Sequence, residues 1–392
     1  MKNPIVVIGA GLAGLNAALE IEAAGESCVI VDEASHVGGK LESTLVDDAY
    51  ILDRGFQILL PAYPELQRLG NLETELDFKY FATGARLERD GGALLMGDPR
   101  RHPKEIASTV LGHYGSLKDK ILVLKLQQLV ASETAESLLK RSSIPTIEFL
   151  KQFGFSDLFI NSFWKPFFTG VFLEENLVTA AGYFLYLVKM FASSPVAVPA
   201  RGIGELPKLM SQRLKRTEIR LSCRATVTNG NRVELSNGEK FEARAVVTET
   251  VGHTQPTDSG PFGRVTSLWF SAPETPFAGA WLSLNSNEKV RSINHVAVLS
   301  NVSPAYAMKG DALICVNLVG ESSAKQMSTE AILADAEVLY GTTTKTWKLL
   351  RRDIIDRALP IYSNRTDSDT PSQQGALLRG RRAAAAVLAR TK

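Results

Sequence analysis

The sequence has few cysteines, little net charge and no regular spacing of metal-binding side chains. Its three cysteines, Cys28, Cys223 and Cys315, lie far apart and form no Cys-x-x-Cys pair. That distribution argues against a disulfide framework or a thiolate metal site and fits a reducing compartment, so we expect a cytoplasmic protein. The five histidines show no metal-site spacing either, and we expect no metal ion. A formal net charge of +2 gives no reason to expect a nucleic-acid partner.

Long apolar runs are also missing. No run reaches the roughly eighteen residues that a membrane-spanning helix needs, and the closest one, residues 180–192, is interrupted by Lys189. The stretch 183–192 could contact a membrane surface, and a buried helix explains it equally well. The chain enters a predicted strand at residue 5, so we expect no signal or transit peptide.

Glycine, by contrast, stands at regular positions near the start of the chain. Gly9, Gly11 and Gly14 form a Gly-x-Gly-x-x-Gly motif between a predicted strand at 5–8 and a predicted helix. The first glycine permits a tight turn, the second lets the backbone approach a pyrophosphate, and the third lets the helix pack closely on the strand. The motif predicts a dinucleotide-binding loop, and a glycine-rich turn without a ligand is the alternative.

Two acidic residues follow the next predicted strand, 28–31. Asp32 stands about twenty residues after the glycines, the distance at which a carboxylate binds a ribose hydroxyl. Glu33 is the neighbouring candidate, and the spacing to the next motif favours Asp32. Strand, helix and strand together predict a right-handed parallel unit.

A second glycine pair lies in Gly38-Gly39-Lys40. It lets the chain pass close to a second part of a long cofactor, with Lys40 near a phosphate, which counts against a dehydrogenase that uses NAD(P) alone. Together the two motifs resemble the flavin amine oxidase superfamily, glutathione-reductase-like flavoproteins that include the phytoene desaturases. This resemblance implies FAD as cofactor, with Leu12 and Ala13 also at its phosphates. Most members have arginine at the position of Lys40, so the charge is kept and the fork geometry is lost.

The resemblance continues beyond these motifs. Segment 52–57 resembles the Asp-x-Gly stretch that passes beside the flavin, and 199–204 is similar to the family's Pro-x-Gly-Gly-Met segment. The resemblance implies that Asp53, Gly55 and Val227 contact the cofactor.

Three residues of the first stretch, Arg54, Phe56 and Gln57, are candidates for positions beside the isoalloxazine ring. The alternative is that Arg54 and Gln57 are ordinary surface or hinge residues. Because a flavin itself accepts the hydride, the protein needs few reactive side chains, and the spacing of residues predicts no catalytic set.

The C-terminal part departs from the family pattern. Its loop and closing helix are similar to those of the family, which implies that Ser372, Gly375 and Ala376 contact FAD, but the expected Gly-Asp pair does not appear. Either Asp367 replaces that carboxylate or FAD binding is weakened. The second outcome leaves open a non-catalytic or flavin-poor member with a binding or scaffold role.

The order of predicted elements indicates an α/β fold with two interleaved domains. One is an FAD/NAD(P)-binding Rossmann-like domain with a parallel sheet, expected in 1–75, 200–255 and 355–392. The other is a substrate domain of antiparallel sheet and helices, expected in 76–199 and 256–354.

An aromatic cluster between residues 163 and 186 bears on the substrate. It could line an apolar cavity, although such a stripe is more often helix core. With the resemblance, it predicts FAD-dependent oxidation, desaturation or isomerisation of a hydrophobic small molecule. The sequence specifies neither the electron acceptor nor the oligomeric state.

Overall fold

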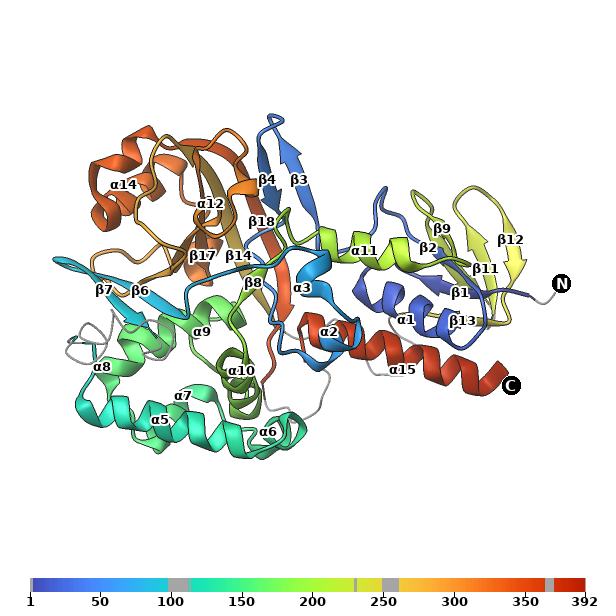
Figure 1. Ribbon diagram of the computed structural model, residues 1–392, viewed down its shortest axis with the longest axis horizontal. Helices are drawn as coiled ribbons and strands as arrows, with labels where there is room; N and C mark the ends of the chain where they lie inside the picture. Colours follow the sequence, from blue (N-terminus) through green and yellow to red (C-terminus); the bar gives the residue numbers. More distant parts are fainter. Residues whose placement is uncertain are drawn as a thin grey trace.

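The computed structural model describes residues 3–97, 112, 114–228, 231–248, 261–363 and 370–391. These residues form two lobes along the long axis of the molecule, and both ends of the chain lie in the same lobe (Figure 1). The lobe with the chain ends contains a parallel sheet, and the other contains a larger sheet covered by helices.

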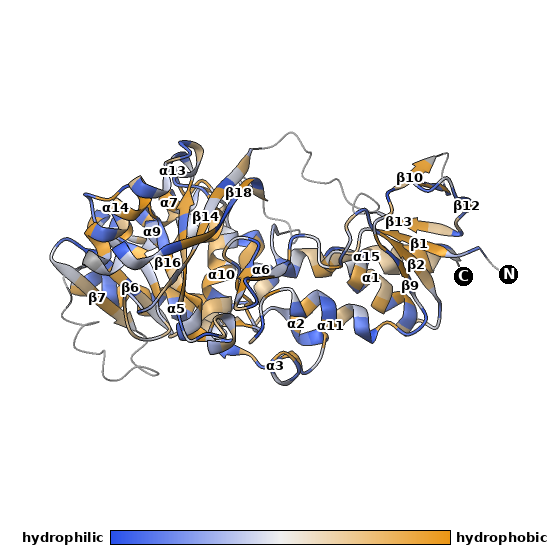
Figure 2. Ribbon diagram, turned by 90° about the horizontal axis from the view of Figure 1, so that it is seen from above, coloured by the Kyte–Doolittle hydropathy of each residue, from blue (hydrophilic) through white to orange (hydrophobic). Residues whose placement is uncertain are grey.

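The first lobe is built on a four-stranded parallel sheet. Three of its strands, β1, β2 and β13, are apolar and mostly buried, as expected when both faces of a parallel sheet are covered, whereas the edge strand β9 is partly exposed. Figure 2 shows β1 and β2 as largely hydrophobic. One face packs on two helices and the other on a three-stranded antiparallel sheet. In sheet order the parallel strands are β13 (Ala245–Val247), β1 (Ile5–Ile8), β2 (Cys28–Val31) and β9 (Glu218–Arg220). The helices are α1 (Leu12–Ala23) and α15 (Gln373–Thr391), and the smaller sheet contains β10 (Ala225–Thr228), β11 (Arg232–Leu235) and β12 (Lys240–Glu242).

The second lobe is built on a seven-stranded sheet. All neighbouring strands in it are antiparallel except β15 and β6, which run parallel. In sheet order its strands are β18 (Lys348–Pro360), β14 (Phe262–Ala272), β17 (Ala312–Val319), β16 (His295–Val298), β15 (Leu282–Asn285), β6 (Gly84–Arg89) and β7 (Gly92–Gly97).

Helices cover this sheet (Figure 1). The group from α5 to α10 forms a separate layer that joins the main apolar core, and α14 packs on the sheet face that carries Leu268 and Val316. The first group contains α5 (Leu117–Ser132), α6 (Ala135–Arg141), α7 (Thr146–Phe153), α8 (Asp157–Phe159), the π-helix Ile160–Trp164, α9 (Lys165–Phe172) and α10 (Ala181–Ser193). Near the sheet lie α12 (Leu299–Val302), α13 (Glu321–Ala324), α14 (Thr329–Tyr340) and two 3-10 helices, Pro304–Tyr306 and Gly341–Thr346.

Short elements connect the lobes. They include two two-stranded sheets, β3 with β4 and β5 with β8. Their bounds are β3 (Ser43–Val46), β4 (Tyr50–Asp53), β5 (Lys79–Tyr80) and β8 (Ala197–Val198), and the connecting helices are α2 (Pro64–Arg68), α3 (Leu72–Glu75) and α11 (Glu205–Arg213).

The fold class expected from the sequence is confirmed: a parallel-sheet domain is combined with an antiparallel sheet and helices. The domain boundaries stay a prediction, and β18 continues to Pro360 within the larger sheet. Residues 183–192 belong to α10, whose residues from Tyr183 to Val188 are all buried, which favours the buried helix over a membrane contact as the explanation of this stretch. In the part of the chain that the structure describes, no helix is both long and apolar enough to cross a bilayer.

Candidate cofactor and substrate site

A cavity of about 1900 Å³ is lined by residues of both lobes. Pockets for a single drug-sized ligand occupy about 300–1,000 Å³. The cavity therefore has room for a long cofactor and a second molecule side by side.

The first glycine motif forms one end of this cavity. Gly9 has a positive φ of 103°, and a Cβ on Gly14 would lie 1.8 Å from the Gly9 carbonyl oxygen, so α1 can begin here only with glycine at that place. Gly11, Leu12 and Ala13 line the cavity as well. No side chain of the described residues caps the first turn of α1, so its backbone N–H groups are available to an anion.

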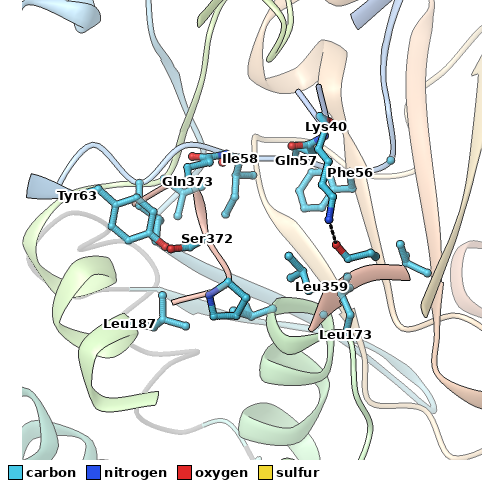
Figure 3. Close-up of a pocket in the computed structure, with 18 of the residues that line it drawn as sticks. Lys40, Phe56, Gln57, Ile58, Tyr63, Leu173, Leu187, Leu359, Ser372 and Gln373 are labelled. Atoms are coloured by element: carbon cyan, nitrogen blue, oxygen red, sulfur yellow. Dashed lines mark hydrogen bonds between the residues drawn. The ribbon is translucent and has the colours of Figure 1, made fainter. Parts of the chain in front are cut away.

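The second glycine pair lies against the first motif. Gly38 pairs with Gly11 in a parallel bridge, and a Cβ on Gly39 would lie 3.3 Å from Gly11 Cα. Lys40 Nζ donates a hydrogen bond to the carbonyl oxygen of Ala358, 3.1 Å away (Figure 3). The close approach of two backbones leaves a smooth surface without side chains, which fits the pyrophosphate of a dinucleotide.

Asp32 and Glu33 both line the cavity and have different contacts. The Asp32 carboxylate accepts hydrogen bonds from the backbone N–H groups of Ala10 (2.5 Å) and Ala34 (2.7 Å), so it holds the glycine loop in place. Glu33 is exposed, and its Oε2 atom lies 2.7 Å from Arg224 Nε. This geometry favours Glu33 as the ribose partner, whereas the sequence spacing favoured Asp32.

Asp53 is buried beside the cavity and is not among the residues that line it. Its carboxylate accepts hydrogen bonds from Ser43 Oγ (2.6 Å), the backbone N–H of Ile203 (3.0 Å) and Tyr306 Oη (2.8 Å). Burial raises the pKa of Asp53 to about 6, although these hydrogen bonds oppose the shift. Asp53 therefore fixes the segment that follows it, rather than contacting a ligand in the cavity as the resemblance implied.

The next residues do reach the cavity. Arg54, Gly55, Phe56 and Gln57 all line it. The amide nitrogen of Gln57 donates to the carbonyl oxygens of Lys40 (2.8 Å) and Arg54 (3.0 Å), which ties this segment to the second glycine pair. The Phe56 ring lies at the cavity wall beside Gln57 (Figure 3).

The start of α15 also faces the cavity. Ser372, Gln373 and Ala376 line it, and Ser372 Oγ accepts a hydrogen bond from the backbone N–H of Gly375 at 3.2 Å. Gly375 itself lies behind this surface, where a Cβ would come within 1.9 Å of the Thr370 carbonyl oxygen. Gln373 Oε1 is buried without a hydrogen-bond partner among the described residues. This acceptor fits a cofactor ring that carries an N–H group.

Two other expected cofactor contacts have different outcomes. Val227 lies on β10, is exposed, and is not among the residues that line the cavity. The structure therefore gives it no place at the candidate site. Asp367 lies outside the described residues.

The far end of the cavity is apolar and aromatic. The two interpretations of the aromatic cluster each hold for part of it: Phe172, Phe184 and Tyr186 are buried core, while other members form the cavity wall. Leu124 on α5 lines the cavity and is 65% exposed, so the cavity reaches the surface beside this helix. We call this end the aromatic chamber, lined by Phe163, Trp164, Phe167, Phe168, Leu187 and Phe191.

A row of polar side chains crosses the large sheet below Phe56. The register aligns His295 with Asn317, Asn317 with Ser267, and Ser267 with Asp353, so the four side chains share one face of the sheet. Ser267 Oγ donates to Asn317 Oδ1 at 2.6 Å, and His295 and Asn317 line the cavity. Sequence reasoning missed this row because its members lie on four strands and share no motif.

Known proteins support the same cofactor chemistry. A profile of the family described as flavin containing amine oxidoreductase matches residues 12–340. Over 136 residues the chain is 32% identical to the flavin-containing monooxygenase FMO GS-OX-like 7 of Arabidopsis thaliana. That segment covers 34% of this chain and only 27% of the relative.

Solved structures share the fold over almost the whole chain. A candidate protoporphyrinogen oxidase from Exiguobacterium sp. 255-15 aligns with a TM-score of 0.71 and 15% identity, covering 99% of both chains. Putrescine oxidase bound to putrescine gives 0.66 and 15% over 99% of both chains. Reduced UDP-galactopyranose mutase gives 0.65 and 13%, covering 99% of this chain and 96% of that one.

The family profile extends over most of the sequence and includes both lobes. The resemblance inferred from the glycine motifs is thereby confirmed, and the flavin-poor alternative is not favoured. The chain belongs to the flavin-containing amine oxidoreductase family and is an FAD-dependent oxidoreductase.

Proposed function

We propose that this protein oxidises, desaturates or isomerises an apolar small molecule that binds in the aromatic chamber. The observation that carries the proposal is the continuity of one cavity from the glycine loops to the chamber. A molecule in the chamber would lie beside the part of the cofactor farthest from its phosphates. Bound FAD supplies a hydride acceptor at its flavin ring.

The residues of this chain would divide the work of holding FAD. The N–H groups at Gly11 to Gly14 and the adjoining pair Gly38-Gly39 would hold the pyrophosphate, and Glu33 would bind the ribose. The positive end of α15 would face the pyrimidine part of the flavin, where a helix N-terminus stabilises negative charge.

The segment Arg54 to Gln57 would separate the cofactor from the large sheet. Its position is fixed by the buried Asp53 and by the two hydrogen bonds that the Gln57 side chain donates to backbone carbonyl oxygens. The role of this segment would be to orient the flavin and to exclude water from its face, with no proton transfer assigned to Arg54 or Gln57.

The chamber wall favours hydrophobic substrates, because burying an apolar group is worth about 25 cal/mol per Å² and an unpaired charge is costly there. Isoprenoids, porphyrin-like rings and apolar amines have the required character.

The test is an anaerobic reduction assay on the purified, flavin-coloured protein. A panel of apolar alcohols, amines and polyenes is added, and loss of the oxidised flavin absorbance is followed. Phe163→Leu, in the chamber wall, should weaken the response, and Phe172→Leu, behind the wall, is the matched control. A protein that takes up FAD but whose flavin responds identically in both variants would contradict the assignment of the chamber.

We also propose that α5 touches a lipid surface where apolar substrate enters. Leu117, Ile121 and Leu124 are 69%, 47% and 65% exposed and follow helical spacing, so they form one apolar stripe. Leu124, at one end of the stripe, also lines the cavity. Lys118 and Lys125 are exposed on the same helix, an arrangement that suits anionic lipid headgroups.

Vesicle co-sedimentation tests this contact. Binding should be stronger to vesicles of mixed phosphatidylcholine and phosphatidylglycerol than to phosphatidylcholine alone, and Leu117→Glu should abolish it. Val338→Glu is the matched control, because Val338 is 55% exposed on α14, away from the cavity. Equal loss in both variants, or no binding by the unmodified protein, would refute the contact.

A further inference from the structure

His295 occupies the end of the polar row that is nearest to the aromatic chamber. The register of the sheet places it between Leu284 and Asn317, and all three side chains line the cavity. His295 is only 4% exposed. Its ring centre lies 5.2 Å from that of Phe56, so His295 lies between the segment Arg54 to Gln57 and the aromatic chamber.

The hydrogen bonds around this ring determine which nitrogen carries the proton. Asn294 Nδ2 donates to the carbonyl oxygen of Pro166 at 3.1 Å, which orients the amide so that Oδ1 faces His295 Nδ1, 2.8 Å away. The opposite amide orientation would set Oδ1 against the Pro166 carbonyl oxygen. Because an amide oxygen only accepts, Nδ1 must donate. A neutral imidazole has one such proton, so Nε2 carries a lone pair.

The ring is also kept neutral. Burial lowers the pKa of His295 to about 3, because a low-dielectric environment disfavours the imidazolium. At neutral pH the side chain is therefore a hydrogen-bond acceptor at Nε2, and its role is not that of an acid.

That acceptor has no partner within the described residues. His295 Nε2 is buried and unpaired there, whereas the neighbouring Asn317 already accepts a hydrogen bond from Ser267. A buried polar atom left unpaired costs about 1–3 kcal/mol, and such atoms in native proteins usually meet a ligand or an ordered water. The missing partner must donate a hydrogen bond.

We propose that His295 Nε2 accepts a hydrogen bond from an O–H or N–H group of the substrate. This inference rests on the proposed function and narrows it: the substrate is an apolar molecule with a hydroxyl or an uncharged amine at the end that faces the flavin. An ammonium group would lose its hydration in an apolar chamber next to a neutral ring, so the uncharged donor is preferred. His295 is then a residue that determines specificity and positions the substrate.

Three naphthalenes that differ in one group test this inference on the FAD-loaded protein. 2-Naphthol and 2-naphthylamine have a donor, and 2-methoxynaphthalene does not. Perturbation of the flavin absorbance gives their Kd values. We expect the naphthol or the amine to bind about fivefold more tightly than the ether, as one hydrogen bond provides.

Substitutions then show where that preference arises. His295→Phe keeps a ring and removes the acceptor, so the naphthol, the amine and the ether should bind about equally well. His295→Gln, with an amide oxygen, should recover part of the preference. His36→Gln is the matched control, because His36 lies at the surface beside Glu42 and should leave the preference unchanged. A preference that survives His295→Phe, or equal binding of all three probes to the unmodified protein, overturns the inference.

The proton position has its own readout that needs no substrate. In ¹⁵N-histidine-labelled protein the long-range ¹H–¹⁵N spectrum should show a protonated Nδ1 and a bare Nε2 for His295, assigned by its disappearance in His295→Gln. Protonation at Nε2 would refute the inference while leaving the proposed function intact. If none of the probes perturbs the flavin, the aromatic chamber is not the binding site and the proposed function itself fails.

Discussion

The glycine loop allows one substitution that harms only cofactor binding and one that harms the protein itself. Gly11 has φ −76° and ψ −178°, which any residue adopts, and a Cβ there would meet nothing closer than Gly39 Cα at 4.0 Å. Gly11→Ala should therefore fold normally. Its methyl group would occupy the surface on which the pyrophosphate is expected to lie.

The magnitude follows from packing. An extra methyl group in a close-packed contact costs about 1–3 kcal/mol, which corresponds to a Kd for FAD roughly 5- to 160-fold higher. Without FAD, the stability of Gly11→Ala should equal that of the unmodified protein or exceed it by about 0.4–1 kcal/mol, because alanine restricts the unfolded chain.

Gly14→Ala is the contrasting variant. Its Cβ would lie 1.8 Å from the carbonyl oxygen of Gly9, a main-chain atom that cannot rotate away. This variant should lose stability with or without FAD, by about 1–3 kcal/mol or more.

The assay combines flavin titration with denaturant unfolding of both variants in the presence and absence of FAD. Saturating ligand at about 100 times Kd stabilises the unmodified protein by about 2.7 kcal/mol, and at the same FAD concentration Gly11→Ala should lose about 0.9–2.4 kcal/mol of that gain. If Gly11→Ala binds FAD as tightly as the unmodified protein, the pyrophosphate does not lie on this loop and the reasoning fails.

Three further predictions follow from buried contacts. Asp32→Ala should reduce both stability and FAD affinity, by about 1–3 kcal/mol in unfolding experiments, because two loop N–H groups lose their acceptor; unchanged unfolding would contradict this role. The pKa of Asp53 is raised to about 6, so its contribution to stability is present below about pH 4 and lost as pH rises through 6. The unfolding free energy of Asp53→Asn should lack that step, and a curve parallel to the unmodified protein would refute the assignment. Gly380→Val should separate α15 from α1, since a Cβ would lie 2.1 Å from the Ala13 carbonyl oxygen; a drop in flavin content and in thermal stability should follow, and normal values for both would oppose it.

Local sequence predicted the cofactor loops well. Gly9 and Gly11 lie between β1 and α1, and Gly14 lies in the first turn of α1, so their conformational requirements can be inferred from neighbouring residues alone. The role of the pair Gly38-Gly39 could also be predicted from the sequence, because the close approach of two backbones requires residues without side chains.

Neighbouring positions with similar chemistry could not be separated in the same way. Asp32 and Glu33 are adjacent carboxylates, and only the hydrogen bonds from Ala10 and Ala34 show that the first supports the loop. The second is exposed at the cavity and is paired with Arg224. Asp53 was placed at the cofactor by resemblance, and its burial behind the cavity follows from contacts with residues 150 and 253 positions away.

By itself the sequence determined the first βαβ unit, the dinucleotide loop and the family, because these depend on short-range backbone geometry. Only the tertiary structure decided which aromatic residues face the cavity. Phe168 and Phe172 are four residues apart on α9, a spacing that a helix packed in the core also has, and yet only Phe168 lines the cavity. It also placed His295 beside Phe56 and left its Nε2 atom without a partner among the residues that the structure describes. The physical reason is that sheet register and helix packing bring together residues that no local pattern connects.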